Sequence, residues 1–133
     1  MTIESNDKRE LIKHRLDQAD ETIEDVRILI ENNRLRASIN RIYYGMFYSL
    51  LALGIKNDFE TSKHAQLVGW FNKNFINEGL IDPKYGKNIN KAFNRRTKGD
   101  YDIYIDFDKD TVIEMYNEMQ DFIAMIREYI END

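Results

Sequence analysis

Apolar residues recur every three or four positions in two long segments, one near each end of the chain. The first segment runs from about Lys8 to Glu31, and its apolar residues are Ile12, Leu16, Ala19, Ile23, Val26 and Ile30. The last segment begins near Asp110, with Thr111 and Glu114 at capping-box spacing. Its apolar residues are Val112, Tyr116, Met119, Ile123, Ile126 and Ile130. Because this spacing puts each set on one face of a helix, we predict a long amphipathic helix at each end.

Between these segments lies the most apolar helical stretch of the chain. It follows Asn32 and Asn33, which suit a turn, and it ends near Gly54. Its apolar positions are Ile39, Ile42, Tyr43, Met46, Phe47, Leu50, Leu51 and Leu53. These positions cover much of a helix's circumference rather than one stripe. We therefore predict a central helix that packs against its neighbours on several sides.

Two shorter helices are predicted in the second half of the chain. The first is expected to be capped by Thr61 or Ser62 and to end at residues 77–79. The residues expected on its inward face are His64, Val68, Phe71 and Phe75. The second begins at Asp82 and Pro83, an N-cap residue followed by a proline at the first helical position. Both helices are shorter than the three described above.

These segments together predict an all-α fold, an antiparallel up-and-down bundle of about five helices with a four-helix core and one short helix. The 133 residues fit one domain, in which residues 1–7 are expected to form a flexible tail. Segment 100–108 departs from the helical pattern, because acidic residues alternate there with apolar ones. We predict a loop across the bundle with Ile103, Ile105 and Phe107 facing inward. A calcium loop fits less well, because Thr111 would stand where such a loop needs glycine.

Composition narrows the functional classes. The net charge of −5 argues against a protein that binds nucleic acid through overall basicity, but it leaves room for a local basic patch. The chain contains no cysteine and only two histidines, so we expect no disulfide, no metal site and no cofactor. No stretch approaches the ~20 apolar residues that cross a bilayer, and no signal peptide is apparent. We therefore expect a cytoplasmic protein without membrane partners.

The central helix carries an unusual set of polar side chains. These are Asn40, Arg41, Tyr43, Tyr44 and Tyr48. Since residues one apart on a helix lie about 100° apart, the set cannot serve one pocket. We expect Asn40, Tyr43 and Tyr44 to face inward with Phe47, and Arg41 and Tyr48 to lie at a rim or dimer surface. One interpretation is a polar network inside the core, and the other is a pocket for a nucleotide or RNA.

The two histidines and a basic cluster complete the candidate chemistry. His14 fits an ordinary surface histidine, whereas His64 is either a satisfied core residue or a ligand-binding or catalytic one. Arg95, Arg96 and nearby Lys98 end the fourth predicted helix. They either complement the negative end of that helix, with an Arg–Asp ion pair, or bind phosphate. These residues alone indicate no reaction.

Several short motifs taken together resemble the HEPN domain family, a group of nucleotide-binding domains, over roughly residues 8–130. The motifs are Arg36-Ala37-Ser38, Asn40-Arg41, Tyr43-Tyr44, Phe47, Ser62-Lys63-His64, Phe71-Asn72, Lys91-Ala92-Phe93, Arg95-Arg96 and Asp100-Tyr101. The resemblance implies a bundle of about five helices that often forms a homodimer. It also implies a domain that stands alone or is encoded beside a minimal nucleotidyltransferase as a toxin–antitoxin pair. Many members of the family are metal-independent ribonucleases, and others bind nucleotide or RNA.

In the nuclease members, an arginine near this helix end is followed a few residues later by a histidine. Here Tyr101 stands at that distance from Arg96, and no histidine follows it. A tyrosine with an ordinary pKa near 10 is a poor general acid or base, so His64 would have to supply this role from another helix. In some paired toxins a tyrosine in this region is nucleotidylated by the partner. The resemblance therefore makes Tyr101 and Tyr104 candidates for modification.

The sequence thus predicts a HEPN-like module that binds nucleotide or RNA, and the resemblance makes it a candidate for one half of a toxin–antitoxin pair with a nucleotidyltransferase. The residues expected to bind the ligand are Asn40, Arg41, Tyr44, Arg95, Asp100 and Tyr101. Arg96 and His64 are the candidates for catalysis. A metal-independent ribonuclease toxin is the main alternative, and a non-catalytic dimeric interaction module is the second.

Overall fold

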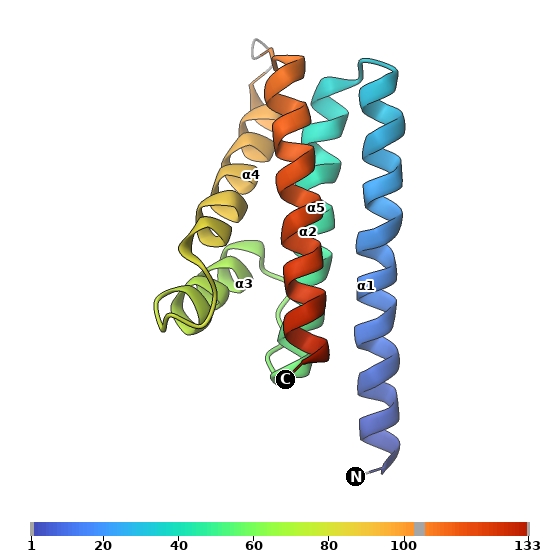
Figure 1. Ribbon diagram of the computed structural model, residues 1–133, viewed down its shortest axis with the longest axis vertical. Coiled ribbons are helices and arrows are strands. Elements are labelled where there is room, and N and C mark those ends of the chain that lie inside the picture. The colour runs from blue at the N-terminus through green and yellow to red at the C-terminus, as the bar shows by residue number, and fades with distance from the viewer. Residues whose placement is uncertain (1, 103–105, 133) are drawn as a thin grey trace.

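The fold is a helical bundle whose chain runs up and down. The computed structural model describes the backbone of residues 2–102 and 106–132 and the side chains of residues 6–102 and 106–132. In chain order the elements are α1 (Thr2–Glu31), α2 (Leu35–Lys56), α3 (His64–Phe71), the π-helix η1 (Asn72–Ile76), α4 (Pro83–Tyr101) and α5 (Lys109–Glu131). In Figure 1, α1, α2 and α5 are the long rods, α4 leans against them, and α3 lies beside the lower part of α4. The predicted all-α up-and-down bundle is confirmed.

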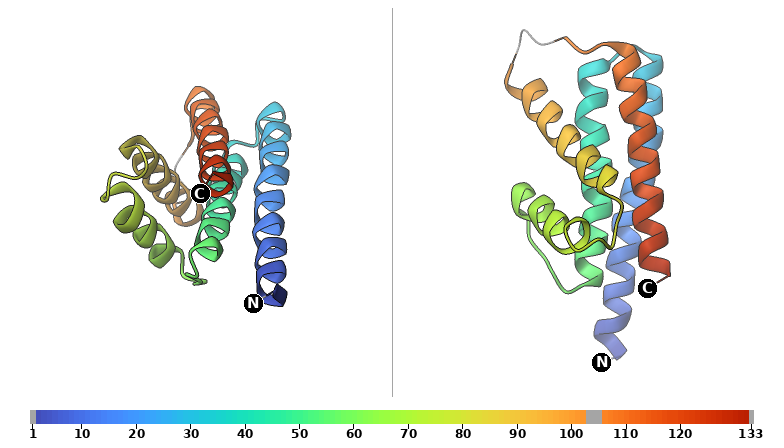
Figure 2. Two further views of the ribbon diagram at one scale, coloured as in Figure 1. Left: turned by 60° about the horizontal axis from the view of Figure 1, so that its bottom comes forward. Right: turned by 60° about the vertical axis from the view of Figure 1, so that its left-hand side comes forward.

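Helix α2 is the centre of the core, as predicted. It packs against α1, α3, α4 and α5, and Figure 2 shows it enclosed between α1, α4 and α5. Its fully buried side chains include Ile39, Ile42, Tyr43, Leu50 and Leu53. The predicted stripes of α1 and α5 meet this helix through buried residues such as Val26 and Ile126. Burial of apolar side chains on several faces of one helix gives the bundle a single continuous core.

The ends of the helices follow the sequence signals in some places and depart from them in others. The carboxylate of Asp82 caps α4 by accepting a hydrogen bond from the Lys84 backbone amide at 2.9 Å, as predicted. The caps predicted for α3 and α5 were wrong. Helix α5 is capped by Asp108, whose carboxylate accepts from the Thr111 amide at 3.2 Å, and Lys63 occupies the N-cap of α3 with no side-chain bond. Each error is a matter of which nearby polar residue caps the helix, which local sequence alone decides poorly.

Two further boundaries differ from expectation. Helix α1 begins at Thr2 rather than near Lys8, so it includes most of the segment expected to be a tail. Helix α4 continues through Asp100 to Tyr101, so these two residues are helical and not part of an extended loop. Phe107 is half-buried, and a methyl group added at Gly99 would lie 3.3 Å from its ring, so its inward position is confirmed. Ile103 and Ile105 lie outside the described residues.

The π-helix η1 brings α3 and the start of α4 into close contact. A β-carbon placed on Gly86 of α4 would lie 2.9 Å from Asn72 Oδ1 and 3.2 Å from Ile76 Cγ1. Only glycine allows the two backbones to approach this closely without a shift. This contact fixes α3 against α4, which places the first residue of α3, His64, near the C-terminal half of α4.

None of the helices in the described part of the chain is long and apolar enough to span a membrane. Among the same residues, no three histidine or acidic side chains gather closely enough to hold a metal ion. The Asp106, Asp108 and Asp110 series therefore forms no such group within the described chain.

Candidate functional site

Arg96 is the centre of the candidate site. Its guanidinium carbon lies 5.0 Å from the ring centroid of Tyr43 and 5.7 Å from that of Tyr44, so the cation of α4 rests on two aromatic rings of α2. Phe93, three residues earlier in α4, contributes a third ring at 5.7 Å. Residues three apart lie on the same side of a helix, so Phe93 and Arg96 approach α2 together. Cation–π contacts of this kind hold the guanidinium in place.

The polar atoms of Arg96 are only partly satisfied within the described chain. Nη1 pairs with the carboxylate of Asp100 one turn later at 3.3 Å, and the side chain as a whole is 16% exposed. Nε is buried and has no hydrogen bond to any described residue. A guanidinium has five N–H donors, and a buried donor without an acceptor is costly. Arg96 is therefore a cation fixed by its aromatic neighbours, and some of its N–H donors have no acceptor among the described residues.

His64, the first residue of α3, joins the same cluster from a third helix. Its ring stacks on Phe47 with the ring centroids 4.1 Å apart and the planes 9° from parallel. Its Nδ1 lies 2.8 Å from the hydroxyl oxygen of Tyr43, and it is the one hydrogen-bond partner of that hydroxyl among the described residues. The ring is half-buried. Both aromatic residues that fix His64 come from α2, which is the most buried helix of the bundle.

The environment keeps His64 and Tyr43 neutral. Burial lowers the pKa of His64 below its usual 6.5, and the positive charge of Arg96 lowers it further. Burial also raises the pKa of the Tyr43 hydroxyl far above its usual value, against a smaller opposing effect of Arg96. A buried hydroxyl needs an acceptor for its proton, and His64 Nδ1 is the one that lies in reach. We therefore assign Tyr43 as the donor to Nδ1, which places the imidazole proton of His64 on Nε2.

A second group of polar residues continues the cluster along α2. Tyr44 is half-buried and meets the Tyr43 ring edge-on with a centroid distance of 5.4 Å. The guanidinium of Arg41 lies 5.2 Å from the Tyr44 ring centroid and donates to the Tyr48 hydroxyl at 3.4 Å. Asn40 is half-buried, with no hydrogen bond to a described residue. The α2 tyrosines thus connect two arginines from different helices, as both interpretations of this helix require.

The structure brings some of the sequence candidates together and leaves others apart. Tyr44, His64, Arg96 and Asp100 form one cluster. Arg95 is half-buried, and among the described residues it has no hydrogen bond, ion pair or cation–π contact with this cluster. Tyr101 is 82% exposed at the end of α4. Tyr104 lies outside the described residues. His14 is exposed on α1, as expected for a surface histidine.

Sequence reasoning missed two aromatic residues that build the site. Tyr43 was expected to face inward, but its role as the partner of His64 was not predicted. Phe93 was noted only as part of a motif, although it carries the α4 side of the aromatic cluster at 5.5 Å from Tyr43. The spacing of Tyr43 and Phe47, four residues apart, and of Phe93 and Arg96, three apart, was the available signal.

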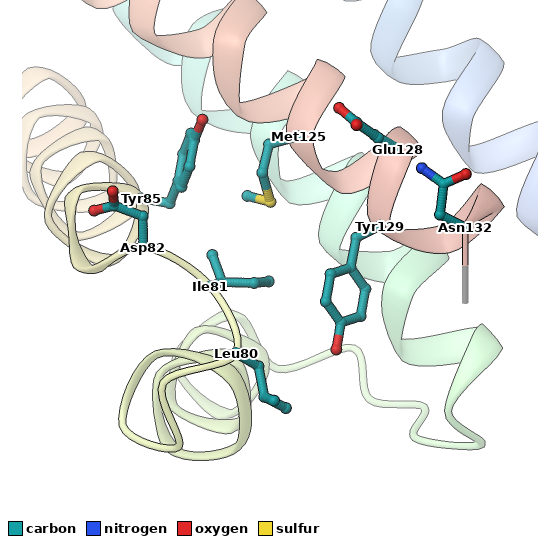
Figure 3. A pocket seen from close by; sticks show the side chains of 8 residues that line it. All are labelled: Leu80, Ile81, Asp82, Tyr85, Met125, Glu128, Tyr129 and Asn132. Carbon is teal, nitrogen blue, oxygen red and sulfur yellow. The ribbon is translucent and has the colours of Figure 1, made fainter.

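A separate hollow at the other end of α4 has a different chemistry. Its volume is about 460 Å³, and it is lined by Leu80, Ile81, Asp82, Tyr85, Met125, Glu128, Tyr129 and Asn132. Figure 3 shows Ile81 and Met125 near its centre, between the turn before α4 and the last turns of α5. Its charged lining residues, Asp82 and Glu128, are acidic. An anionic ligand is therefore better matched by the Arg96 cluster than by this hollow.

Comparison with known proteins gives a consistent result. The profile of the HEPN domain matches residues 12–129. A protein of Thermotoga maritima named "UPF0332 protein" is 32% identical over 127 residues, which cover 96% of each chain. A protein of Methanocaldococcus jannaschii named "Putative toxin MJ0605" is 37% identical over 97 residues, which cover 73% of this chain and 72% of the relative. A second protein of that organism, named "Putative toxin MJ0142", is 29% identical over 92% of this chain and 83% of its own.

Proposed function

Because the chain belongs to the HEPN domain family, we propose that it binds the phosphate of RNA or of a nucleotide between Arg96 and His64. The observation that carries the proposal is the state of these two side chains. Arg96 is a cation held on aromatic rings, and its side chain is 16% exposed, so part of the guanidinium is open to a ligand. His64 is neutral and turns an Nε2–H donor away from Tyr43. Charge-assisted donors of this type bind phosphate oxygens well.

The net charge of the protein is −5, so the positive charge that attracts a phosphate has to be concentrated at this site. Attraction of RNA by the whole protein is weak, so affinity must come from a few direct contacts. Arg41, close to Tyr44, provides further positive charge near the site. We expect a shallow dependence of affinity on salt, with a slope that corresponds to a few phosphate contacts.

The test is binding of a labelled RNA pool in EDTA, by wild type and by two variants. Arg96→Gln is expected to weaken binding by about tenfold or more, because a hydrogen bond to a charged group contributes about 1.5–3 kcal/mol. Arg27→Gln is the matched control, since it removes one positive charge from an exposed residue of α1 that is paired with Glu24 and Glu31. Equal losses in the two variants would contradict a specific role for Arg96.

The juxtaposition of His64 and Arg96 favours a second candidate, a metal-independent ribonuclease. In this reaction the ribose 2′-oxygen attacks the phosphorus, the bond to the 5′-oxygen breaks, and the proton of the 2′-hydroxyl passes through water to the leaving 5′-oxygen. Arg96 and the neutral Nε2–H of His64 would donate hydrogen bonds to the phosphoryl oxygens and so stabilise their added negative charge. This arrangement supplies from α3 the histidine that is missing after Arg96.

The same RNA pool separates these candidates. Cleavage in EDTA that is lost in His64→Gln while RNA binding is retained would identify a ribonuclease. Binding without cleavage would identify a binding module. If wild type shows neither, the chain serves as an interaction module, and the phosphate proposal is wrong.

We also propose that the protein acts as a homodimer beside a minimal nucleotidyltransferase that modifies Tyr101. HEPN domains are commonly dimeric, and relatives are named as toxins. Tyr101 is exposed enough for another protein to reach, and it lies five residues after Arg96 in α4. Addition of a nucleotide there would place negative charge less than two helical turns along α4 from Arg96. Light scattering tests the dimer, and intact mass after incubation with ATP, magnesium and the neighbouring transferase tests the modification, with Tyr101→Phe as the control.

A further inference from the structure

A small pocket adjoins the Arg96 cluster on the other side of Phe93. It has a volume of about 290 Å³ and lies between α3 and η1 on one wall and α4 on the other. The lining residues used below are Ala65, Gly69, Asn72, Asn90, Phe93 and Asn94. Ala65 follows His64 directly in the chain, and Phe93 also contacts Arg96. The pocket and the phosphate site are therefore neighbours that share one aromatic residue.

The polar groups of this pocket are carboxamides rather than charges. Asn72 Nδ2 donates to Asn90 Oδ1 at 3.2 Å, which links the two walls. Asn90 and Asn94 are exposed at the mouth of the pocket, and the amide nitrogen of Asn90 and both polar atoms of Asn94 have no hydrogen bond to any described residue. None of the residues that line the pocket carries a charge. Such a lining suits a neutral group with donors and acceptors side by side, and it does not suit a phosphate.

A carboxamide presents one donor and one acceptor next to each other, as the edge of a nucleobase does. Pairing of asparagine with a base edge through two hydrogen bonds is a common way in which proteins recognise bases. The ring of Phe93 provides an aromatic surface in the same pocket, and aromatic side chains stack on unpaired bases. The pocket therefore combines asparagine amides that can hydrogen-bond to the edge of a base with a phenylalanine ring that can stack on its face.

Gly69 forms part of the α3 wall of the pocket. It is exposed, and a β-carbon added there would meet no atom within 4 Å, so this side of the pocket opens to solvent. A ligand can therefore enter here, and a larger side chain at position 69 would narrow the pocket without disturbing the core.

From these observations we propose that the pocket between Gly69 and Asn94 is a nucleobase subsite. The base would stack on Phe93 and hydrogen-bond to Asn94 and Asn90, while its own phosphate lies between Arg96 and His64. This inference rests on the proposed phosphate site and adds to it a basis for selecting among the four bases.

The experiment compares ligands with and without a base. Ribose 5-phosphate and the four nucleoside 5′-monophosphates are titrated into the protein, and affinities are measured from NMR chemical shifts. Wild type is expected to bind at least one monophosphate about fivefold more tightly than ribose 5-phosphate, given the usual contribution of stacking. Gly69→Leu, which fills the empty space, and Asn94→Ala are expected to remove this preference and leave the affinity for ribose 5-phosphate unchanged.

Controls separate the subsite from the phosphate site. Asn117→Ala removes an exposed asparagine from α5, and it is expected to behave as wild type. Arg96→Gln is expected to weaken binding of ribose 5-phosphate and of all monophosphates alike. If wild type binds ribose 5-phosphate as tightly as the monophosphates, or if Gly69→Leu and Asn94→Ala keep the wild-type preference, the subsite is refuted and the phosphate site stands. If wild type binds none of these ligands, both proposals are refuted.

Discussion

Replacement of Tyr43 by phenylalanine tests how His64 is held. The tyrosine is fully buried, and its hydroxyl lies 2.8 Å from His64 Nδ1. Phenylalanine has the same ring, so the stacking with Phe47 and the edge contact with Phe93 should remain. The variant therefore removes one hydrogen bond and little else. Such a bond contributes about 0.5–1.5 kcal/mol, and water can reach the half-buried imidazole to replace it in part.

We therefore expect Tyr43→Phe to lower the free energy of unfolding by about 1 kcal/mol, or the melting temperature by about 4 °C for a domain of this size. Tyr44→Phe is the matched control on the next residue. The Tyr44 hydroxyl has no hydrogen bond to a described residue, so its removal should change stability by less than about 0.5 kcal/mol. Urea denaturation followed by circular dichroism measures both.

The same variant tests the assigned position of the imidazole proton. If the Tyr43 hydroxyl donates to Nδ1, this bond stabilises the neutral ring, and its loss raises the pKa of His64. NMR titration of the imidazole carbon-bound protons measures this pKa, and a His14→Gln variant assigns the signals. A lower pKa of His64 in Tyr43→Phe would mean that Nδ1 carries the proton and donates to the hydroxyl. That result would refute the Nε2–H donor on which the proposed contact of His64 with phosphate depends.

Three further predictions concern pH, charge geometry and packing. Since the pKa of His64 is below 6.5 in the folded chain, the unfolded chain takes up this proton more readily, so wild type should lose stability as the pH falls below 6.5. In His64→Gln this part of the dependence should vanish, and an unchanged dependence of urea midpoints on pH would contradict the assignment. Arg96→Lys keeps the charge but lacks the planar fork that rests on Tyr43, so RNA affinity in filter binding should fall several-fold; equal affinity would show that charge alone suffices. Gly54→Ala should lower stability by about 2 kcal/mol, because its β-carbon would lie 2.6 Å from the Phe59 carbonyl oxygen, whereas Gly69→Ala should not lower it; similar urea midpoints for both variants would contradict this steric argument.

The fold could be predicted largely because its determinants are local and periodic. The apolar stripes of α1 and α5 follow from spacings of three and four residues within each helix. The start of α4 follows from the adjacent residues Asp82 and Pro83. The start of α5 was predicted within one residue, but its cap was assigned to Thr111 instead of Asp108, because both residue types are good N-caps and only the path of the preceding chain decides between them.

The candidate site also has one part that the sequence could predict and one part that it could not. Arg96 could be singled out from its neighbours in sequence, since it lies in a basic cluster at a helix end. The contact between Tyr43 and His64 joins residues 21 positions apart, and it depends on how α3 crosses the bundle. That crossing follows from the approach of η1 to Gly86, which no periodic pattern encodes. His64 was therefore predicted as a candidate residue, but its pairing with Tyr43 was not.

The way in which α3 is held has a consequence for the site. A helix of eight residues is unstable alone, so His64 keeps its place only through the packing of α3. That packing comes from buried Leu67 and Phe71 and from the stacking of Trp70 on Phe59 at 4.8 Å. Arg96, in contrast, rests on tyrosines of the most buried helix. Opening of α3 would remove His64 and the Gly69 wall together while it leaves the guanidinium in position, because the cation and its aromatic support belong to α4 and α2. The Arg96 side of the proposed phosphate site is thus fixed by the core, whereas its His64 side and one wall of the proposed nucleobase subsite depend on one short helix.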